Sequence, residues 1–202
     1  MYNVIRKTLG ILLVAGMLGS TLVYADNPFG VDLPKSIDDF GAIAYEDPSS
    51  GFTFKKAYSA FFFQGHHAYD DPRLGYSLAY ASPTQTSISV YVYNYGLEDI
   101  PTGTESNLVE NQLISSVKGI RDSGRYLQVS EEVRPALSPH FLQSFQKITL
   151  NQGDTLKSYM LLRGERGHFV KVRVTGYSEA LERRVADFLH YMLQDLGAIQ
   201  GP

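Results

Sequence analysis

The sequence contains no cysteine. Without thiols the protein can form no disulfide, no thiolate metal site and no thioester intermediate, and it cannot carry a lipid on an N-terminal cysteine. Basic residues are also in the minority, since 18 Lys and Arg stand against 21 Asp and Glu and give a net charge of −3. This balance argues against non-specific binding to nucleic acid, which depends on a basic surface.

Long apolar runs are missing as well, except for one at the N-terminus. Arg6 and Lys7 precede the apolar stretch Leu9–Leu22, and Val23–Ala25 has the small residues that a signal peptidase requires. We therefore predict a Sec-type signal peptide over residues 1–25, cleaved after Ala25, and a periplasmic or secreted protein with no membrane span after cleavage. The alternative is an uncleaved N-terminal anchor, although the run is shorter than the roughly 20 apolar residues of a membrane span.

The rest of the chain divides into an arm and one folded domain. Residues 26–50 are rich in Asp, Pro and Gly and predict an irregular N-terminal arm. Residues 51–202 predict a single α+β domain, because a chain of this size can bury about 70% of its unfolded surface without disulfides.

One alternating stretch, from Thr86 to Tyr95, predicts the central strand of this domain. Aliphatic side chains at Ile88, Val90 and Val92 alternate with serines and tyrosines. A period of two places the two sets on opposite faces of a β-strand. Because aliphatic side chains fill one face and tyrosines the other, we expect an antiparallel sheet that is covered on both sides.

Further strands are predicted before and after this stretch, at residues 52–54, 57–68, 76–80, 126–134, 141–151, 155–163 and 168–176. A first helix is predicted from about Glu105 to Ser123, with an apolar stripe that consists of Leu108, Leu113, Val117 and Ile120. A second helix is predicted after the N-cap candidate Ser178, with Gly197 as its stop. The fold class is therefore α+β: an antiparallel sheet of about six to eight strands with two main helices packed on it.

This order of elements resembles the PsbP-like fold, and it is also similar to small exported bacterial proteins with no assigned function. The local matches are Val90–Tyr93 running into Gly96–Pro101, and Gly167–Arg173 followed by the terminal helix. The resemblance extends over residues 50–197 and is one of pattern. It implies non-enzymatic partner binding, such as an accessory or assembly role on a larger complex, and it brings no cofactor and no functional residue with it.

The first candidate binding surface is a basic strip on the predicted hairpin of residues 163–173. Alternation along its second strand predicts a valine face for the core and a cationic face that includes an aromatic residue. Such a strip can dock a carboxylate-rich or phosphate-bearing partner. The alternative is a solvated face, or long side chains that cover the terminal helix. The candidate residues are Arg163, Arg166, His168, Lys171 and Arg173.

The second candidate is a row of tyrosines, Tyr91, Tyr93 and Tyr95, on one face of the central strand. A tyrosine combines an apolar ring with a polar tip, which suits a ligand groove. The alternative is ordinary cross-strand packing beneath a helix.

Histidines next to carboxylates give a third candidate, a metal site at His66, His67 and Asp70. Neighbouring residues of a strand point to opposite faces, so His66 and His67 cannot easily share an ion. We therefore predict no metal, no cofactor and no catalytic residue. The preferred hypothesis is an exported, non-enzymatic binding or accessory domain that engages a protein partner or a small ligand in the cell envelope, and the second hypothesis is a metal-dependent hydrolase-type enzyme centred on these three residues.

Overall fold

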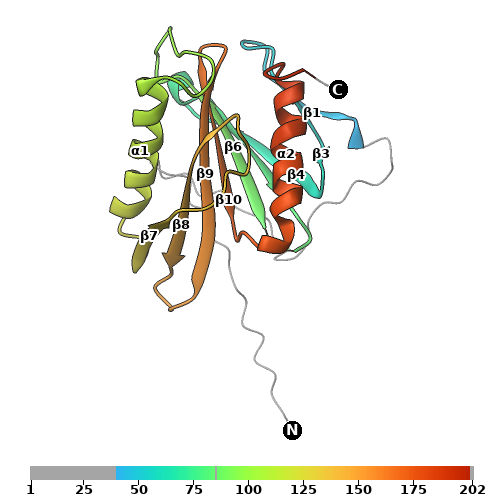
Figure 1. Cartoon of the computed structure of the whole chain (residues 1–202). Coiled ribbons are helices and arrows are strands. Elements are labelled where there is room, and N and C mark those ends of the chain that lie inside the picture. Colours follow the sequence, from blue (N-terminus) through green and yellow to red (C-terminus); the bar gives the residue numbers. More distant parts are fainter. Residues whose placement is uncertain (1–39, 85, 201–202) are drawn as a thin grey trace.

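Eight antiparallel strands form one sheet in the spatial order β3-β4-β5-β6-β10-β9-β8-β7 (Figure 1). The computed structural model describes residues 40–84 and 86–200. The strands are β3 (Ala57–Tyr58), β4 (Phe61–Ala68), β5 (Tyr76–Ala81), β6 (Ser87–Tyr93), β7 (Gln128–Glu132), β8 (Leu142–Thr149), β9 (Thr155–Glu165) and β10 (His168–Thr175).

The predicted central strand is confirmed as β6. It pairs with β5 on one side and with β10 on the other, so that the chain leaves the middle of the sheet after β6 and returns to it four strands later. Ile88, Val90 and Val92 pack in the core on the side of helix α2 (Glu182–Asp195), whereas Tyr91 and Tyr93 pack in the core on the side of helix α1 (Asn107–Asp122). The antiparallel α+β architecture predicted from the sequence is therefore present, with a helix on each face of the sheet (Figure 1).

Helix α1 (Asn107–Asp122) covers β8 and β9. Ser106 caps its start, because the Ser106 Oγ accepts a hydrogen bond of 3.1 Å from the Leu108 N–H. The predicted apolar stripe is wrong at one position: the Leu108 side chain is 38% exposed, and Val109 is the buried residue of the first turn. Val109 lies four residues before the buried Leu113 and shares its face of the helix, whereas Leu108 lies five residues before it and points away.

Helix α2 (Glu182–Asp195) buries Val185, Phe188, Leu189, Met192 and Leu193 against the other face of the sheet. The predicted N-cap Ser178 precedes a short 3-10 turn, η3 (Glu179–Leu181), and its side chain makes no capping hydrogen bond. Gly197 ends the helix as predicted, with φ of +69° and its N–H donating to the Gln194 carbonyl at 2.9 Å.

The prediction of an irregular arm is wrong where the structure describes it. Strand β1 (Ile43–Glu46) pairs with β2 (Thr53–Lys55) in a separate two-stranded sheet. The predicted strand over 57–68 is interrupted, because Ser59 has φ of +54° and the chain turns there between β3 and β4. The predicted signal peptide and residues 26–39 of the arm lie outside the described residues.

Among the described residues, every helix is too short or too polar to cross a lipid bilayer. The loop between β4 and β5 contains a 3-10 turn, η2 (Pro72–Leu74), in which the Asp71 carboxylate accepts from the Arg73 N–H at 3.0 Å. Gly75 follows with φ of +62°, and a Cβ placed there would lie 1.9 Å from the Val92 carbonyl oxygen. Only glycine therefore lets β5 start this close to β6.

Phe188 is the residue whose truncation should cost the fold most on the α2 side. Its buried ring lies 5.1 Å from the ring of Tyr80, 5.2 Å from that of Tyr58 and 5.6 Å from that of Phe61. We expect Phe188→Ala to lower the free energy of unfolding by about 3–5 kcal/mol, because it opens a cavity between the helix and the sheet. Urea denaturation measures this loss. Tyr191→Ala on the same helix is the control, since Tyr191 is 48% exposed, and a comparable loss there would contradict the assignment.

Candidate functional site

The residues of the predicted basic strip lie on two different faces of the sheet. Phe169, Lys171 and Arg173 point to the α1 side, and the intervening valines point to the α2 side, as the alternation predicted. Arg163 pairs with Val170 across β9 and β10, and His168 lies two residues before Val170, so both are on the α2 side. The five residues predicted as one strip are therefore not one surface.

On the α1 side the structure brings cations and tyrosines together. Lys171 Nζ lies 4.6 Å from the ring centroid of Tyr91 and 5.2 Å from that of Tyr93. Arg173 is buried, and its Nη2 donates to the Tyr126 hydroxyl at 3.4 Å. We call this group the cationic–aromatic cluster, and it consists of Tyr91, Tyr93, Tyr95, Tyr126, Phe169, Lys171 and Arg173.

The tyrosine row is split between the interior and the edge of this cluster. Tyr91 and Tyr93 are buried at 6% and 4% exposure, and Gln112 of α1 donates to the Tyr93 hydroxyl at 2.9 Å. Tyr95 follows the end of β6 with φ of +54° and is 47% exposed, with its ring 4.8 Å from that of Tyr93. The interpretation as a row lining one groove is therefore wrong for the first two tyrosines, which are core residues beneath a helix.

Lys171 carries its charge in an unusual place. It makes no ion pair with any carboxylate in the described part of the chain, and the charge that acts on it is the positive one of Arg173. Burial first, and then the positive charge of Arg173, lower the pKa of the Lys171 ammonium to about 8. The faces of Tyr91 and Tyr93 offset part of this cost through cation–π attraction.

Arg163 has a structural role. Its guanidinium donates to the Glu165 carboxylate at 2.7 Å and to the His140 carbonyl at 3.3 Å, and the side chains of the ion pair are only 5% and 6% exposed. The prediction that Arg163 contributes to an exposed binding strip is wrong, because its charge is neutralised inside the protein.

Arg166 and His168 flank the tight turn between β9 and β10, far along the strand from Arg173. Arg166 has φ of +46°, and its guanidinium lies 5.5 Å from the ring centroid of Phe52. His168 lies edge-on to the same ring at 5.9 Å, and its Nδ1 is 2.9 Å from the Arg166 carbonyl. These two side chains pack against the turn between β1 and β2.

Asp47 is the carboxylate of this β1–β2 turn. It is buried at 5% exposure, and its carboxylate accepts hydrogen bonds from Ser49 and Ser50. Burial alone would raise the pKa of Asp47, but the serine hydrogen bonds and the nearby His168 hold it below its usual value. Arg166 and His168 therefore help to fix the small β1–β2 sheet on the main sheet.

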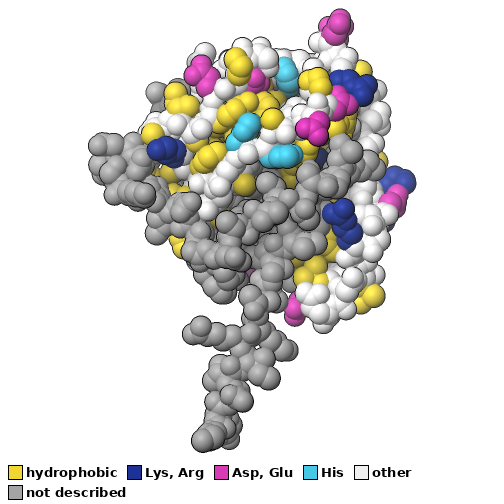
Figure 2. Space-filling model, turned by 180° about the vertical axis from the view of Figure 1, so that it is seen from behind, with side chains coloured by type: hydrophobic (Ala, Val, Ile, Leu, Met, Phe, Trp, Pro, Cys, Tyr) yellow, Lys and Arg dark blue, Asp and Glu magenta, His cyan; other side chains and the backbone are white. Residues whose placement is uncertain are grey.

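The histidine pair occupies both faces of β4, as expected of neighbours on a strand. His66 stacks on Tyr45 with ring centroids 4.1 Å apart, and burial followed by the proximity of His67 lowers the pKa of its imidazole. His67 lies on the other face, edge-on to Tyr69 at 4.8 Å. The described residues contain no group of three His, Asp or Glu side chains that could hold a metal ion, Asp70 included. Seen from behind, histidine side chains lie among hydrophobic ones (Figure 2).

A depression at the start of α2, where two lysines of neighbouring strands face each other, is not predicted from the sequence. Lys147 of β8 pairs with Lys157 of β9, and Glu179 of η3 lies beside them. The predicted strands 141–151 and 155–163 do not fix which residues face each other, because a shift of one residue in the connecting loop would oppose Lys147 to Ser158 and not to Lys157.

Lys171 should make the stability depend on pH at the alkaline end. Because its pKa is lowered in the folded state, the unfolded chain binds more protons between pH 8 and 10.5, so this residue destabilises the fold progressively as the pH falls through that window. We expect Lys171→Met to be more stable than the wild type at pH 7, by up to roughly 3 kcal/mol, and to lose this advantage above pH 10.5. Thermal unfolding from pH 6 to 11 tests this, and an advantage that does not change with pH would contradict it. Lys118→Met, on the exposed side of α1, is the control.

The Arg163–Glu165 pair should be sensitive to removal of one partner. Glu165→Gln leaves the Arg163 charge buried without a counter-charge, and we expect a loss of about 3–5 kcal/mol in the free energy of unfolding. Asp122→Asn breaks an exposed pair with Lys118 and should cost less than about 0.5 kcal/mol. Chemical denaturation of both variants makes the comparison, and equal losses would show that Arg163 is not held as described.

Comparison with models of known protein families finds no match for this chain, and comparisons with curated proteins and with solved structures find none either. The PsbP-like resemblance therefore stays a prediction, while the coarser description, two helices on an antiparallel sheet of eight strands, stands on the structure itself. Function has to be argued from the geometry of this chain alone.

Proposed function

We propose that this protein is an exported, non-enzymatic binding domain, and that its cationic–aromatic cluster holds an anionic group of a ligand or of an envelope partner. Export is inferred from the predicted signal peptide over residues 1–25. The anionic group is a carboxylate or a phosphate, the two common anions that lysine and arginine recognise together.

The observation that carries the proposal is the position of Lys171. An ammonium group that leaves water without a counter-charge is costly, so a fold rarely holds one in a covered place without a use for it. Lys171 lies on the rings of Tyr91 and Tyr93, two residues from the buried Arg173. A bound anion would supply the opposite charge that the described residues do not supply to this lysine.

The composition of the cluster favours binding over catalysis. It offers ring faces, an ammonium, a guanidinium and phenol groups, and burial raises the pKa of the Tyr93 phenol, so that this hydroxyl stays protonated. The cluster contains no histidine and no carboxylate, the groups that most often move protons in hydrolytic reactions. It can therefore hold and orient an anion.

A titration followed site by site tests the proposal. Succinate and the neutral analogue succinamide are added to the ¹⁵N-labelled protein, and backbone amide shifts are recorded. We expect succinate alone to move the amides of Phe169–Arg173, and Lys171→Met to weaken this response by roughly tenfold, the loss of one charge-assisted contact. Equal responses to both compounds, or an unchanged response in the variant, would contradict the proposal.

The source of the anion is decided by a second measurement on protein from intact cells. Native mass spectrometry detects a small acid that copurifies, whereas crosslinking before lysis captures an acidic protein. In either case Lys171→Met should lose the bound species and Lys118→Met should keep it.

A further inference from the structure

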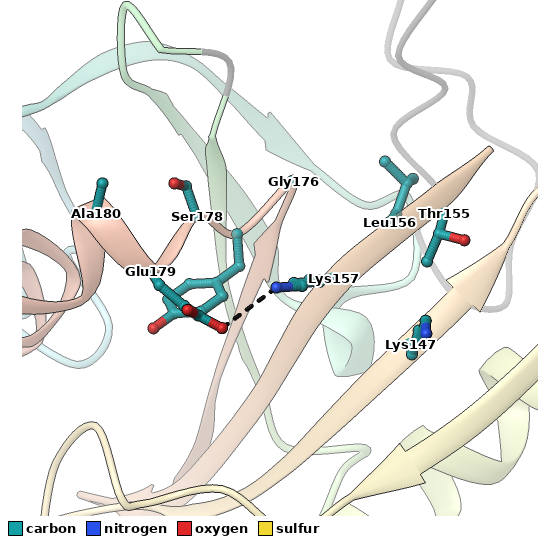
Figure 3. Close-up of a pocket in the computed structure, with 9 residues that line it drawn as sticks. Lys147, Thr155, Leu156, Lys157, Gly176, Ser178, Glu179 and Ala180 are labelled. Atoms are coloured by element: carbon teal, nitrogen blue, oxygen red, sulfur yellow. Dashed lines mark hydrogen bonds and ion pairs between the residues drawn. The ribbon is translucent and has the colours of Figure 1, made fainter.

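A depression of about 720 Å³ opens where α2 begins, and Figure 3 shows the residues that line it. Lys147 and Lys157 lie two residues from Phe145 and Tyr159, so they are on the α2 side of the sheet, opposite the cationic–aromatic cluster. Strands β8 and β9 form one wall, and the segment that leads from β10 into η3 forms the other. The residues that line it are Lys147, Thr155, Leu156, Lys157, Gly176, Tyr177, Ser178, Glu179 and Ala180.

The wall on the sheet contains two cations in direct opposition. Lys147 and Lys157 are cross-strand partners, which places their Cβ atoms about 5 Å apart on one face. Like charges in this arrangement destabilise a sheet. Lys147 is exposed and makes no ion pair within the described part of the chain, so nothing there offsets the repulsion on its side.

The carboxylate of Glu179 partly neutralises Lys157 and a further cation, Arg134. Its Oε1 is 3.3 Å from Lys157 Nζ and 3.4 Å from Arg134 Nη1, and the side chain is 59% exposed. Both contacts are longer than good charged hydrogen bonds, which lie at 2.7–2.9 Å. Lys157 first, and then Arg134, lower the pKa of the Glu179 carboxyl. Glu179 therefore already places an internal anion beside Lys157 (Figure 3), and the lengths of its two contacts indicate that it is loosely held.

A cluster of aromatic rings lies beside these charges. Tyr177 lines the depression, and its ring packs edge-on against Tyr159 at 5.0 Å, with Phe145 at 6.1 Å. Arg134 lies over Phe145 at 5.0 Å and also contacts Glu132 at 3.5 Å. These three rings are buried, so they form an apolar base beneath the depression.

We propose that this depression is a second anion-binding site, in which Lys147 and Lys157 take a carboxylate or phosphate group and Glu179 is an internal competitor that the ligand displaces. Binding would relieve the repulsion between the two lysines. The site is open to solvent, so its affinity should fall as the ionic strength rises. It does not depend on the function proposed for the cationic–aromatic cluster, because the two lie on opposite faces of the sheet.

Calorimetric titration of the whole protein with benzoate, inorganic phosphate and the neutral analogue benzamide tests the site. We expect benzoate and phosphate to bind and benzamide not to bind. Lys147→Ala and Lys157→Ala should each weaken binding roughly tenfold, as expected for the loss of one charge-assisted contact. Glu179→Gln should tighten it about three- to tenfold, because it frees Lys157 and Arg134 from their internal partner.

Two controls separate this site from others. Lys118→Ala removes an equal charge from α1 and should leave binding unchanged. Titrations repeated in the Lys171→Met background remove the anion site proposed for the cationic–aromatic cluster, so the binding that remains there belongs to the depression. Weaker binding in Glu179→Gln, or unchanged binding in both lysine variants, would overturn the proposal. All the substituted side chains at the site are at least partly exposed, and thermal unfolding confirms that the variants fold.

Discussion

Strands β6, β10 and β9 are covered on both faces, and most of the structure follows from that two-sided burial. Side chains alternate along a strand, so each of these strands must suit two different cores at once. On the α2 side they present Ile88, Val90 and the valines of β10. On the α1 side they present tyrosines, Phe169 and Met160. The alternation therefore decides what each helix packs against, and it leaves the α1 side more polar than the other.

The same constraint explains why cations lie inside this protein. Lys171 and Arg173 occupy positions of β10 that must point to the α1 side once the valines point to α2. Their charges lose hydration there, and ring faces and a tyrosine hydroxyl return only part of what is lost. An aliphatic residue at position 171 would fit the fold at a lower cost in free energy. This is the reason for the anion-binding role that we propose for Lys171.

Four basic residues on neighbouring strands illustrate how context sets the role of a charge. Arg163 is buried with Glu165 and is neutralised within the fold. Lys171 is covered by tyrosines and has no such partner among the described residues. Lys147 and Lys157 remain close to water, so their charges cost little free energy but attract an anion only weakly. A buried cation binds an anion strongly once one arrives, whereas exposed lysines bind it loosely and in a salt-dependent way.

The short-range pattern predicted the antiparallel sheet, the central strand and both helices, because periodicity acts over a few positions. It could not assign strand β1, since the alternation in Ile43–Glu46 is short and its partner β2 lies several residues away. It also grouped Arg163 with Lys171, although one is neutralised by Glu165.

By itself, then, the sequence determined which residues alternate and where the chain turns. Only the tertiary structure decided which face each helix covers, which cation meets a carboxylate and which meets a ring. Those contacts join residues far apart in the chain, and no local spacing encodes the distance between them.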